Sequence, residues 1–135
     1  MAEKLLKLEV VAPDHQALSA DVESVVVRTT NGEIGFLPGH APLIAGLVPH
    51  VLRYTDADKK EQRMVIGGGF VEVLNNVVSV MSPSAETAAK IDFERAERAK
   101  ARAEERLKNK DGVDIARAQA ALARALTRLS VKDYL

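Results

Sequence analysis

Proline and glycine are confined almost entirely to the first part of this 135-residue chain, and this separation constrains the fold more than any other feature. All five prolines and seven of the eight glycines precede residue 84, whereas residues 85–135 contain only Gly112 and consist largely of Ala, Arg, Lys, Glu and Leu. Proline and glycine interrupt helices, and the second group of residues favours them. We therefore predict two domains of different secondary structure, 1–84 and 85–135.

The composition argues against several classes of protein. The chain has no cysteine, which excludes a disulfide framework and thiolate metal sites. Its 19 basic and 19 acidic side chains balance, whereas a dedicated nucleic-acid binder needs an excess of positive charge. No apolar stretch approaches the roughly 20 residues of a transmembrane helix, and residues 1–10 lack the continuous apolar region of a signal peptide. We expect a cytosolic protein without direct membrane insertion.

Residues 1–84 show the alternating and β-branched patterns of strands. Leu6, Leu8 and Val10 alternate with charged residues, and Asn75-Asn76 supplies a pair that tolerates the positive φ of a tight hairpin turn. Many short strands at this spacing predict a flattened β-sandwich. The further predicted strands are 22–30, 48–55, 62–66, 70–74 and 77–81.

After Pro83 the apolar residues recur with the period of a helix. Two helices are predicted, separated by breaker residues at 109–112, with Asp114 placed to cap the second. The fold class is therefore α+β, an all-β domain followed by two antiparallel helices. Because alanine buries little area, this hairpin is expected to be only weakly stable alone. The two apolar stripes are Phe93, Ala96, Ala99, Ala103 and Leu107, and Ile115, Ala118, Leu122, Ala125 and Leu129.

The residues indicate neither a catalytic nor a metal site. Gly67-Gly68-Gly69 lies between two predicted strands and is not followed by Lys-Ser or Lys-Thr, so strand packing or a bulge explains it better than a phosphate-binding loop. His15, His40 and His50 have no paired ligand spacing. We predict a non-enzymatic protein.

Arginines follow one another at helical steps in the second domain. Guanidinium groups are preferred partners of phosphate oxygens, and Asp92 is placed to orient Arg95 or to accept hydrogen bonds from a ligand. Helices rich in Ala, Glu, Lys and Arg also carry such stripes as solvated faces, and the pattern alone favours that interpretation. The arginines are Arg95, Arg98, Arg102 and Arg106 on the first helix, and Arg124 and Arg128 on the second.

Four segments carry a resemblance to a known family. They are GEIGFLPGHAPLIAGL at 32–47, GGGFVEV at 67–73, IDFERA at 91–96 and RALTRLSV at 124–131. In order and spacing they resemble the ε subunit of bacterial F-type ATP synthase over nearly the whole chain. The resemblance implies a non-catalytic central-stalk subunit that couples proton or sodium transport to ATP synthesis, peripheral at the cytoplasmic face of the bacterial plasma membrane.

The resemblance also implies partners for both domains. The sandwich is expected to bind the γ subunit and the ring of membrane-embedded c subunits. Glu33 and His40 are the most exposed-looking polar residues of the expected ring-facing loop 32–40, and turn formation is their alternative role. The hairpin is expected to be either compact or extended toward the catalytic α and β subunits, where it inhibits ATP hydrolysis.

IDFERA fits the family's ATP-binding pattern of Ile or Leu, Asp, two free positions, Arg and Ala. By position this implies that Asp92 and Arg95 fix ATP by polar contacts. ATP is then a regulatory ligand that favours the compact hairpin and needs no magnesium, and no cofactor is required. The implied ATP-binding residues are Ile91, Asp92, Arg95, Ala96, Arg102, Arg124 and Arg128, with Glu86 as a weaker candidate.

Three alternatives remain open at this point. A stalk subunit that couples without effective ATP sensing has almost the same sequence. A stand-alone nucleotide-sensing module is the second alternative, and a small enzyme that uses the arginines as an anion site is a distant third.

Overall fold

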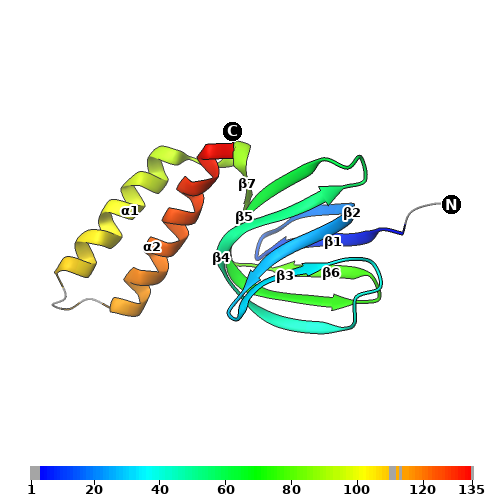
Figure 1. The fold of residues 1–135 in the computed structure, drawn as a ribbon. Helices are drawn as coiled ribbons and strands as arrows, with labels where there is room; N and C mark the ends of the chain where they lie inside the picture. The colour runs from blue at the N-terminus through cyan, green and yellow to red at the C-terminus, as the bar shows by residue number, and fades with distance from the viewer. Residues whose placement is uncertain (1–3, 110–111, 113, 135) are drawn as a thin grey trace. The chain divides into compact units, whose positions relative to one another are not determined.

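The computed structural model describes residues 4–109, 112 and 114–134. The chain divides into two compact units, Met1–Thr87 and Ala88–Leu135. The first is built from strands and the second from helices, so the predicted α+β class is confirmed (Figure 1). The division falls after Thr87 rather than after residue 84, because Ala85–Thr87 adds a short strand to the sheet.

The strands of the first unit form one sheet that closes on itself. The strand order is β1-β6-β5-β4-β2-β3. β1 also pairs with β2, so the sheet closes between these two strands and β3 lies outside the closed part. β1 and β6 are parallel, and β7 pairs with β5. The strands are β1 Leu6–Ala12, β2 His15–Thr29, β3 Gly32–Phe36, β4 Leu43–Asp56, β5 Glu61–Leu74, β6 Val77–Met81 and β7 Ala85–Thr87.

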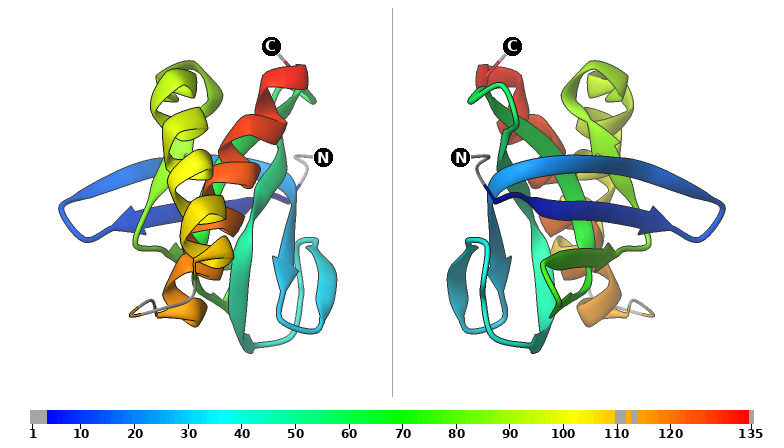
Figure 2. Two further views of the ribbon diagram at one scale, coloured as in Figure 1. Left: turned by 90° about the vertical axis from the view of Figure 1, so that its left-hand side faces the viewer. Right: turned by 90° about the vertical axis from the view of Figure 1, so that its right-hand side faces the viewer.

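Long strands make this closure possible, because each of them pairs with different neighbours along its length. The first half of β2 pairs with β1, and its second half pairs with β3 and β4. Figure 2 shows the β1–β2 hairpin running across the direction of β4 and β5. The result is a flattened sandwich whose core is filled by side chains from nearly every strand, the largest being Phe36, Leu6, Leu8, Leu52, Met64 and Ile66.

The glycine run lies inside β5, not between two strands as expected from the sequence, since 62–66 and 70–74 belong to one continuous strand. A Cβ atom at Gly69, where φ is 105°, would overlap the carbonyl oxygen of Met81. The N–H of Gly67 donates to the carbonyl of Ser84 at 2.8 Å. Close strand packing, one of the two predicted explanations, therefore accounts for these glycines.

Other strands also differ from the predicted ranges, and β2 begins at His15 rather than at residue 22. β4 begins at Leu43 and contains Pro49, which is tolerated because the β2–β4 register is irregular between Val26 and Thr29. Residues 32–36 form β3 and not a loop, so the expected ring-facing loop is shorter than predicted. The Asn75-Asn76 turn is confirmed, with φ of 49° and 63° between paired Leu74 and Val77.

The second unit contains two 16-residue helices, α1 Phe93–Lys108 and α2 Ile115–Ser130, with short 3₁₀ turns at Ala88–Lys90 and Val131–Tyr134. At 1.5 Å per residue each α-helix is about 24 Å long, and the two lie side by side (Figure 1). Among the described residues, no helix combines the length and apolar character that a membrane span requires. The predicted breakers Lys110 and Asp111 lie outside the described residues. The small residues buried in the helices are Ala96, Ala103, Ala118 and Ala125.

Candidate functional site

Asp92 caps the N-terminus of α1. Its backbone is extended, and its Oδ1 accepts a hydrogen bond from the backbone N–H of Arg95 at 3.0 Å. Asp114 makes the same bond to Arg117 at 3.0 Å at the start of α2, as the sequence predicts. A capping carboxylate stabilises a helix by about 1 kcal/mol, and its second oxygen stays available to other donors. The structure thus shows Asp92 in a structural role, as the N-cap of α1.

The residues of IDFERA divide into packing residues and surface residues. Ile91 is 8% exposed and Ala96 is 3% exposed, whereas Asp92 and Arg95 are exposed. Arg102 is also exposed and lies about two helical turns after Arg95 on the same side of α1. Only the polar members of the predicted set on α1 therefore present their side chains to solvent.

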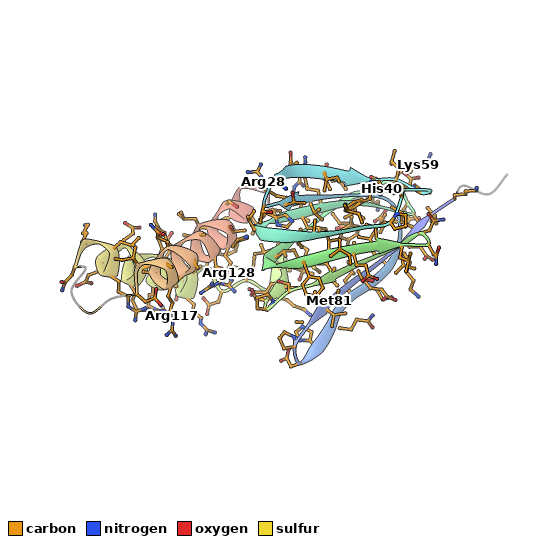
Figure 3. All side chains as sticks on the ribbon, turned by 90° about the horizontal axis from the view of Figure 1, so that it is seen from below. Arg28, His40, Lys59, Met81, Arg117 and Arg128 are labelled. Atoms are coloured by element: carbon orange, nitrogen blue, oxygen red, sulfur yellow. The ribbon has the colours of Figure 1, made fainter. Side chains whose placement is uncertain are left out.

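The antiparallel course of the hairpin brings the end of α2 beside the start of α1. The Nζ of Lys132 lies 5.8 Å from the centre of the Phe93 ring, a cation–π contact between the segment after α2 and the first residue of α1. Arg124 and Arg128 are half-buried in the last two turns of α2, and Figure 3 shows Arg128 and Arg117 on this helix. The structure thus groups Arg124 and Arg128 with the end of the hairpin that carries Asp92. The sequence interpretation missed Lys132, which no spacing pattern distinguishes.

Two other predicted ligands lie elsewhere. Glu86 is on β7, where it pairs with Val65, and so belongs to the sandwich unit rather than to the helical one, contrary to the predicted division. Arg102 lines a shallow hollow on α1 together with Glu105, Arg106 and Asn109. That hollow lies toward the C-terminal end of α1, so Arg102 is about 15 Å along the helix from Asp92.

The segment predicted to face a membrane ring contains one exposed and one half-buried polar residue. Glu33 lies on β3, is exposed, and forms an ion pair with Arg53 at 2.9 Å. His40 is half-buried, because its ring packs edge-on against Phe36 at 4.9 Å and its Nδ1 lies 2.6 Å from the carbonyl oxygen of Ala41. Of the two polar residues expected to be exposed in this segment, Glu33 is exposed and His40 is half-buried.

Large apolar side chains are strongly exposed at the same end of the sandwich. Leu37 is 64% exposed and Ile44 is 70% exposed. The N–H of Gly39 donates to the side-chain oxygen of Asn76 at 2.7 Å, which joins the loop after β3 to the β5–β6 turn next to exposed Leu74. The sequence interpretation missed this surface. Its signal is the almost unbroken apolar run of β5 from Phe70 to Leu74, since a strand with one solvated face alternates.

Side chains of the metal-ligating types are dispersed over the described part of the chain. No group of three or more His, Asp or Glu side chains gathers there in a way that could hold an ion.

A β-sandwich unit with exposed apolar side chains and a unit of two capped helices define a two-unit α+β protein, and comparison with known proteins specifies its family. Residues 5–88 match the family described as ATP synthase, Delta/Epsilon chain, beta-sandwich domain, and residues 90–133 match the ATP synthase, Delta/Epsilon chain, long alpha-helix domain. The chain belongs to the ATP synthase delta/epsilon chain family, as the sequence resemblance indicated.

Individual relatives agree with this assignment. The chain is 48% identical over 107 residues to the ATP synthase epsilon chain of Carboxydothermus hydrogenoformans, covering 79% of this chain and 78% of the relative. It is 45% identical over 107 residues to that of Desulfitobacterium hafniense strain Y51, covering 79% and 80%. A chain in the cryo-EM structure of Euglena gracilis mitochondrial ATP synthase, OSCP/F1/c-ring, has a TM-score of 0.83 at 25% identity, covering 95% of this chain and 81% of that chain.

Proposed function

We propose that this chain is the ε-type subunit of the central stalk of an F-type ATP synthase, a non-catalytic rotor component that couples proton or sodium transport to ATP synthesis. Both units match the family, and relatives that align with most of the chain are named ATP synthase epsilon chain. A chain of the same fold belongs to an F1/c-ring assembly in Euglena gracilis. As part of that enzyme, the subunit would be peripheral at the cytoplasmic face of the bacterial plasma membrane.

The exposed apolar face of the sandwich is the observation that carries this proposal. Phe70 of β5 is 45% exposed and lies in register between Gly46 of β4 and Met81 of β6. Ile44 lies one step along the same face, opposite Glu72. Apolar surface of this kind marks a contact with another macromolecule. We assign it to the γ subunit and the ring of c subunits.

Charge reversal of the apolar face tests the assembly. Phe70→Asp and Ile44→Asp place a carboxylate where a partner has to exclude water, so co-purification with γ from cells expressing the whole enzyme should fall at least tenfold. Ala57→Asp introduces the same charge in the exposed β4–β5 turn and is the matched control. Retention of γ by folded Phe70→Asp and Ile44→Asp variants would contradict this assignment.

ATP control of the hairpin is the finer part of the proposal. Asp92 and Arg95 are exposed at the start of α1, and Arg124 and Arg128 lie in the neighbouring end of α2, so this end of the compact hairpin carries several guanidinium groups, which are preferred partners of phosphate oxygens. Arg102 adds a further exposed guanidinium group on the same side of α1, about two helical turns after Arg95. A ligand at about 100 times its Kd adds about 2.7 kcal/mol to the state that it binds, enough to shift a balanced equilibrium to about 99:1. Bound ATP would thereby keep the hairpin away from the catalytic α and β subunits and relieve inhibition of ATP hydrolysis.

Asp92→Asn separates the two roles of this carboxylate. Asparagine caps helices about as well as aspartate, so the hairpin should stay folded while the negative charge is lost. Asp114→Asn makes the same exchange at the equivalent cap of α2, outside the proposed site, and is the matched control. Arg95→Ala removes a proposed contact without touching a cap.

Titration calorimetry of ATP into the full chain, with and without a chelator, is the measurement. We expect saturable binding that is independent of magnesium, weakened at least tenfold by Asp92→Asn and Arg95→Ala, and unchanged by Asp114→Asn. No heat from a folded protein that still co-purifies with γ would leave a stalk subunit that couples without ATP sensing. Binding of ATP without any association with γ would favour a stand-alone nucleotide-sensing module, and turnover of a substrate would favour an enzyme.

A further inference from the structure

His50 is a buried titratable side chain that the proposed function does not use. It is only 7% exposed, and it lies two residues before the fully buried Leu52 on β4, so the two side chains share the face of the strand that points toward the core. The residue opposite it on β5 is Ile66, which is paired in turn with Ala85 of β7. A polar ring in such apolar surroundings needs a specific explanation.

The hydrogen bonds of the ring define its protonation. Nδ1 lies 2.7 Å from the carbonyl oxygen of Val48, and since a carbonyl only accepts, Nδ1 carries the proton. Nε2 is buried without a hydrogen-bond partner within the described part of the chain. The ring therefore fits this position as the neutral Nδ1–H tautomer, with Nε2 as a bare acceptor.

His50 lies where β4 departs from a regular pairing. Val26 and Thr29 of β2 are paired with Arg53 and Leu47 of β4, so the stretch of β4 between these pairs is longer than the stretch of β2 that it faces. Val48 and His50 are both in this bulge. The bond from His50 to Val48 thus fixes the bend of β4 at a place where regular bonds to β2 are interrupted.

Charged groups near the ring come from the neighbouring strands. Burial is the largest effect, and it lowers the pKa of the His50 imidazole. The hydrogen bond to the Val48 carbonyl raises this pKa. Of the two nearby charges, Arg28 of β2 lowers the pKa and Glu33 of β3 raises it. Figure 3 labels Arg28. Glu33 is already paired with Arg53 at 2.9 Å, and the facing residues of β5 and β7 at this register are apolar.

We propose that His50 is a proton-sensitive switch in the sandwich: the neutral ring stabilises the bend of β4 through Val48, and protonation destabilises this arrangement, because the buried ring then carries a charge and the new Nε2–H has no acceptor among the described residues. The folded state then binds the proton at lower pH than the unfolded chain does. Stability is therefore fully present above the ordinary histidine pKa and is lost as the pH falls below it. Between the two pKa values the unfolding constant should rise up to about tenfold for each unit by which the pH falls. The switch concerns the sandwich itself and does not depend on ATP binding.

Nitrogen NMR of the full chain tests the protonation state directly. Chemical shifts of the imidazole nitrogens distinguish the two tautomers, and loss of a signal in His50→Asn identifies His50 among the three histidines. We expect a protonated Nδ1 and a bare Nε2 at about pH 8, and protonation at lower pH than in an unfolded peptide. A proton on Nε2 at high pH, or titration at the ordinary pKa, would overturn the proposal.

Urea unfolding across the same pH range tests the consequence. His50→Asn keeps a donor near the position of Nδ1 but cannot titrate, so its stability should lose most of its dependence on pH between about pH 8 and pH 5. His15→Asn removes an exposed histidine beside Asp14 and should retain the pH dependence of the unmodified chain. Equal pH dependence in His50→Asn and the unmodified chain would overturn the switch, and if His50→Asn does not fold, the NMR titration of the unmodified chain decides.

Discussion

Gly69→Ala should destabilise the sandwich strongly, although it adds a single methyl group. The φ of Gly69 is 105°, a conformation that alanine adopts only under strain of about 1–3 kcal/mol. The new Cβ would also overlap the carbonyl oxygen of Met81, a backbone atom that cannot rotate away. Overpacking of this kind adds about 1–3 kcal/mol. The sum is a loss of about 2–6 kcal/mol in the free energy of unfolding.

Gly46→Ala is the matched control on the adjacent strand. Gly46 has no positive φ, and a Cβ there would meet Thr30 at an ordinary contact distance of 3.6 Å. The same substitution should therefore change stability by less than about 1 kcal/mol, and by restricting the unfolded chain it can even stabilise. The two variants differ in backbone conformation and available space, not in the atoms added.

Differential scanning calorimetry of the full chain measures the difference. A loss of at least about 2 kcal/mol lowers the Tm of a domain of this size by about 8–16 °C. We expect this shift in Gly69→Ala and a shift of a few degrees at most in Gly46→Ala. Equal Tm values for the two variants would refute the conclusion that the glycine run in β5 is required by close packing against Met81.

Three further outcomes are expected. Ala103 is 1% exposed in the helical unit, so Ala103→Leu should overpack the helices and lower their free energy of unfolding by about 1–3 kcal/mol. Urea unfolding followed by circular dichroism measures this loss, and Ala116→Leu at an exposed position should not lower the stability. Asp114→Ala removes the cap of α2 and should cost about 1 kcal/mol in the same assay, and Asp114→Asn should restore most of it. The backbone N–H of Lys60 donates to Asp56 and is the largest cause of the lowered pKa of this carboxyl group. Asp56→Asn should therefore make the free energy of unfolding less sensitive to acid below the ordinary carboxyl pKa. Unchanged acid sensitivity would contradict the role of Asp56 in the β4–β5 turn.

Most of the helical unit could be predicted from its sequence because its signals are local. The spacing of Ala96, Ala103, Ala118 and Ala125 specifies the faces that become buried, and Asp114 is at the cap that its position predicts. The strands were less predictable at their ends. β3 and the first part of β4 were not predicted, because their pairing partners are distant along the chain and no local period marks them.

The candidate ATP site was predictable only in part. The motif identifies Asp92 and Arg95, but their exposure and the capping bond of Asp92 require coordinates. The sequence grouped Glu86 with the helices, and the β7 pairing places it on the sheet. No sequence pattern marks His50 as the buried member of the three histidines, and its burial follows only from the folded sheet.

Local sequence patterns are enough to predict the division into a strand unit and a helical unit, the helix faces and caps, the tight turns and the family. These features depend on residue periods and on residues within a few positions of one another. Tertiary structure decided which strands close the sandwich, why Gly69 must be glycine, which apolar side chains remain exposed and how His50 is protonated. Each of these depends on atoms brought together from distant parts of the chain, so no local pattern records them.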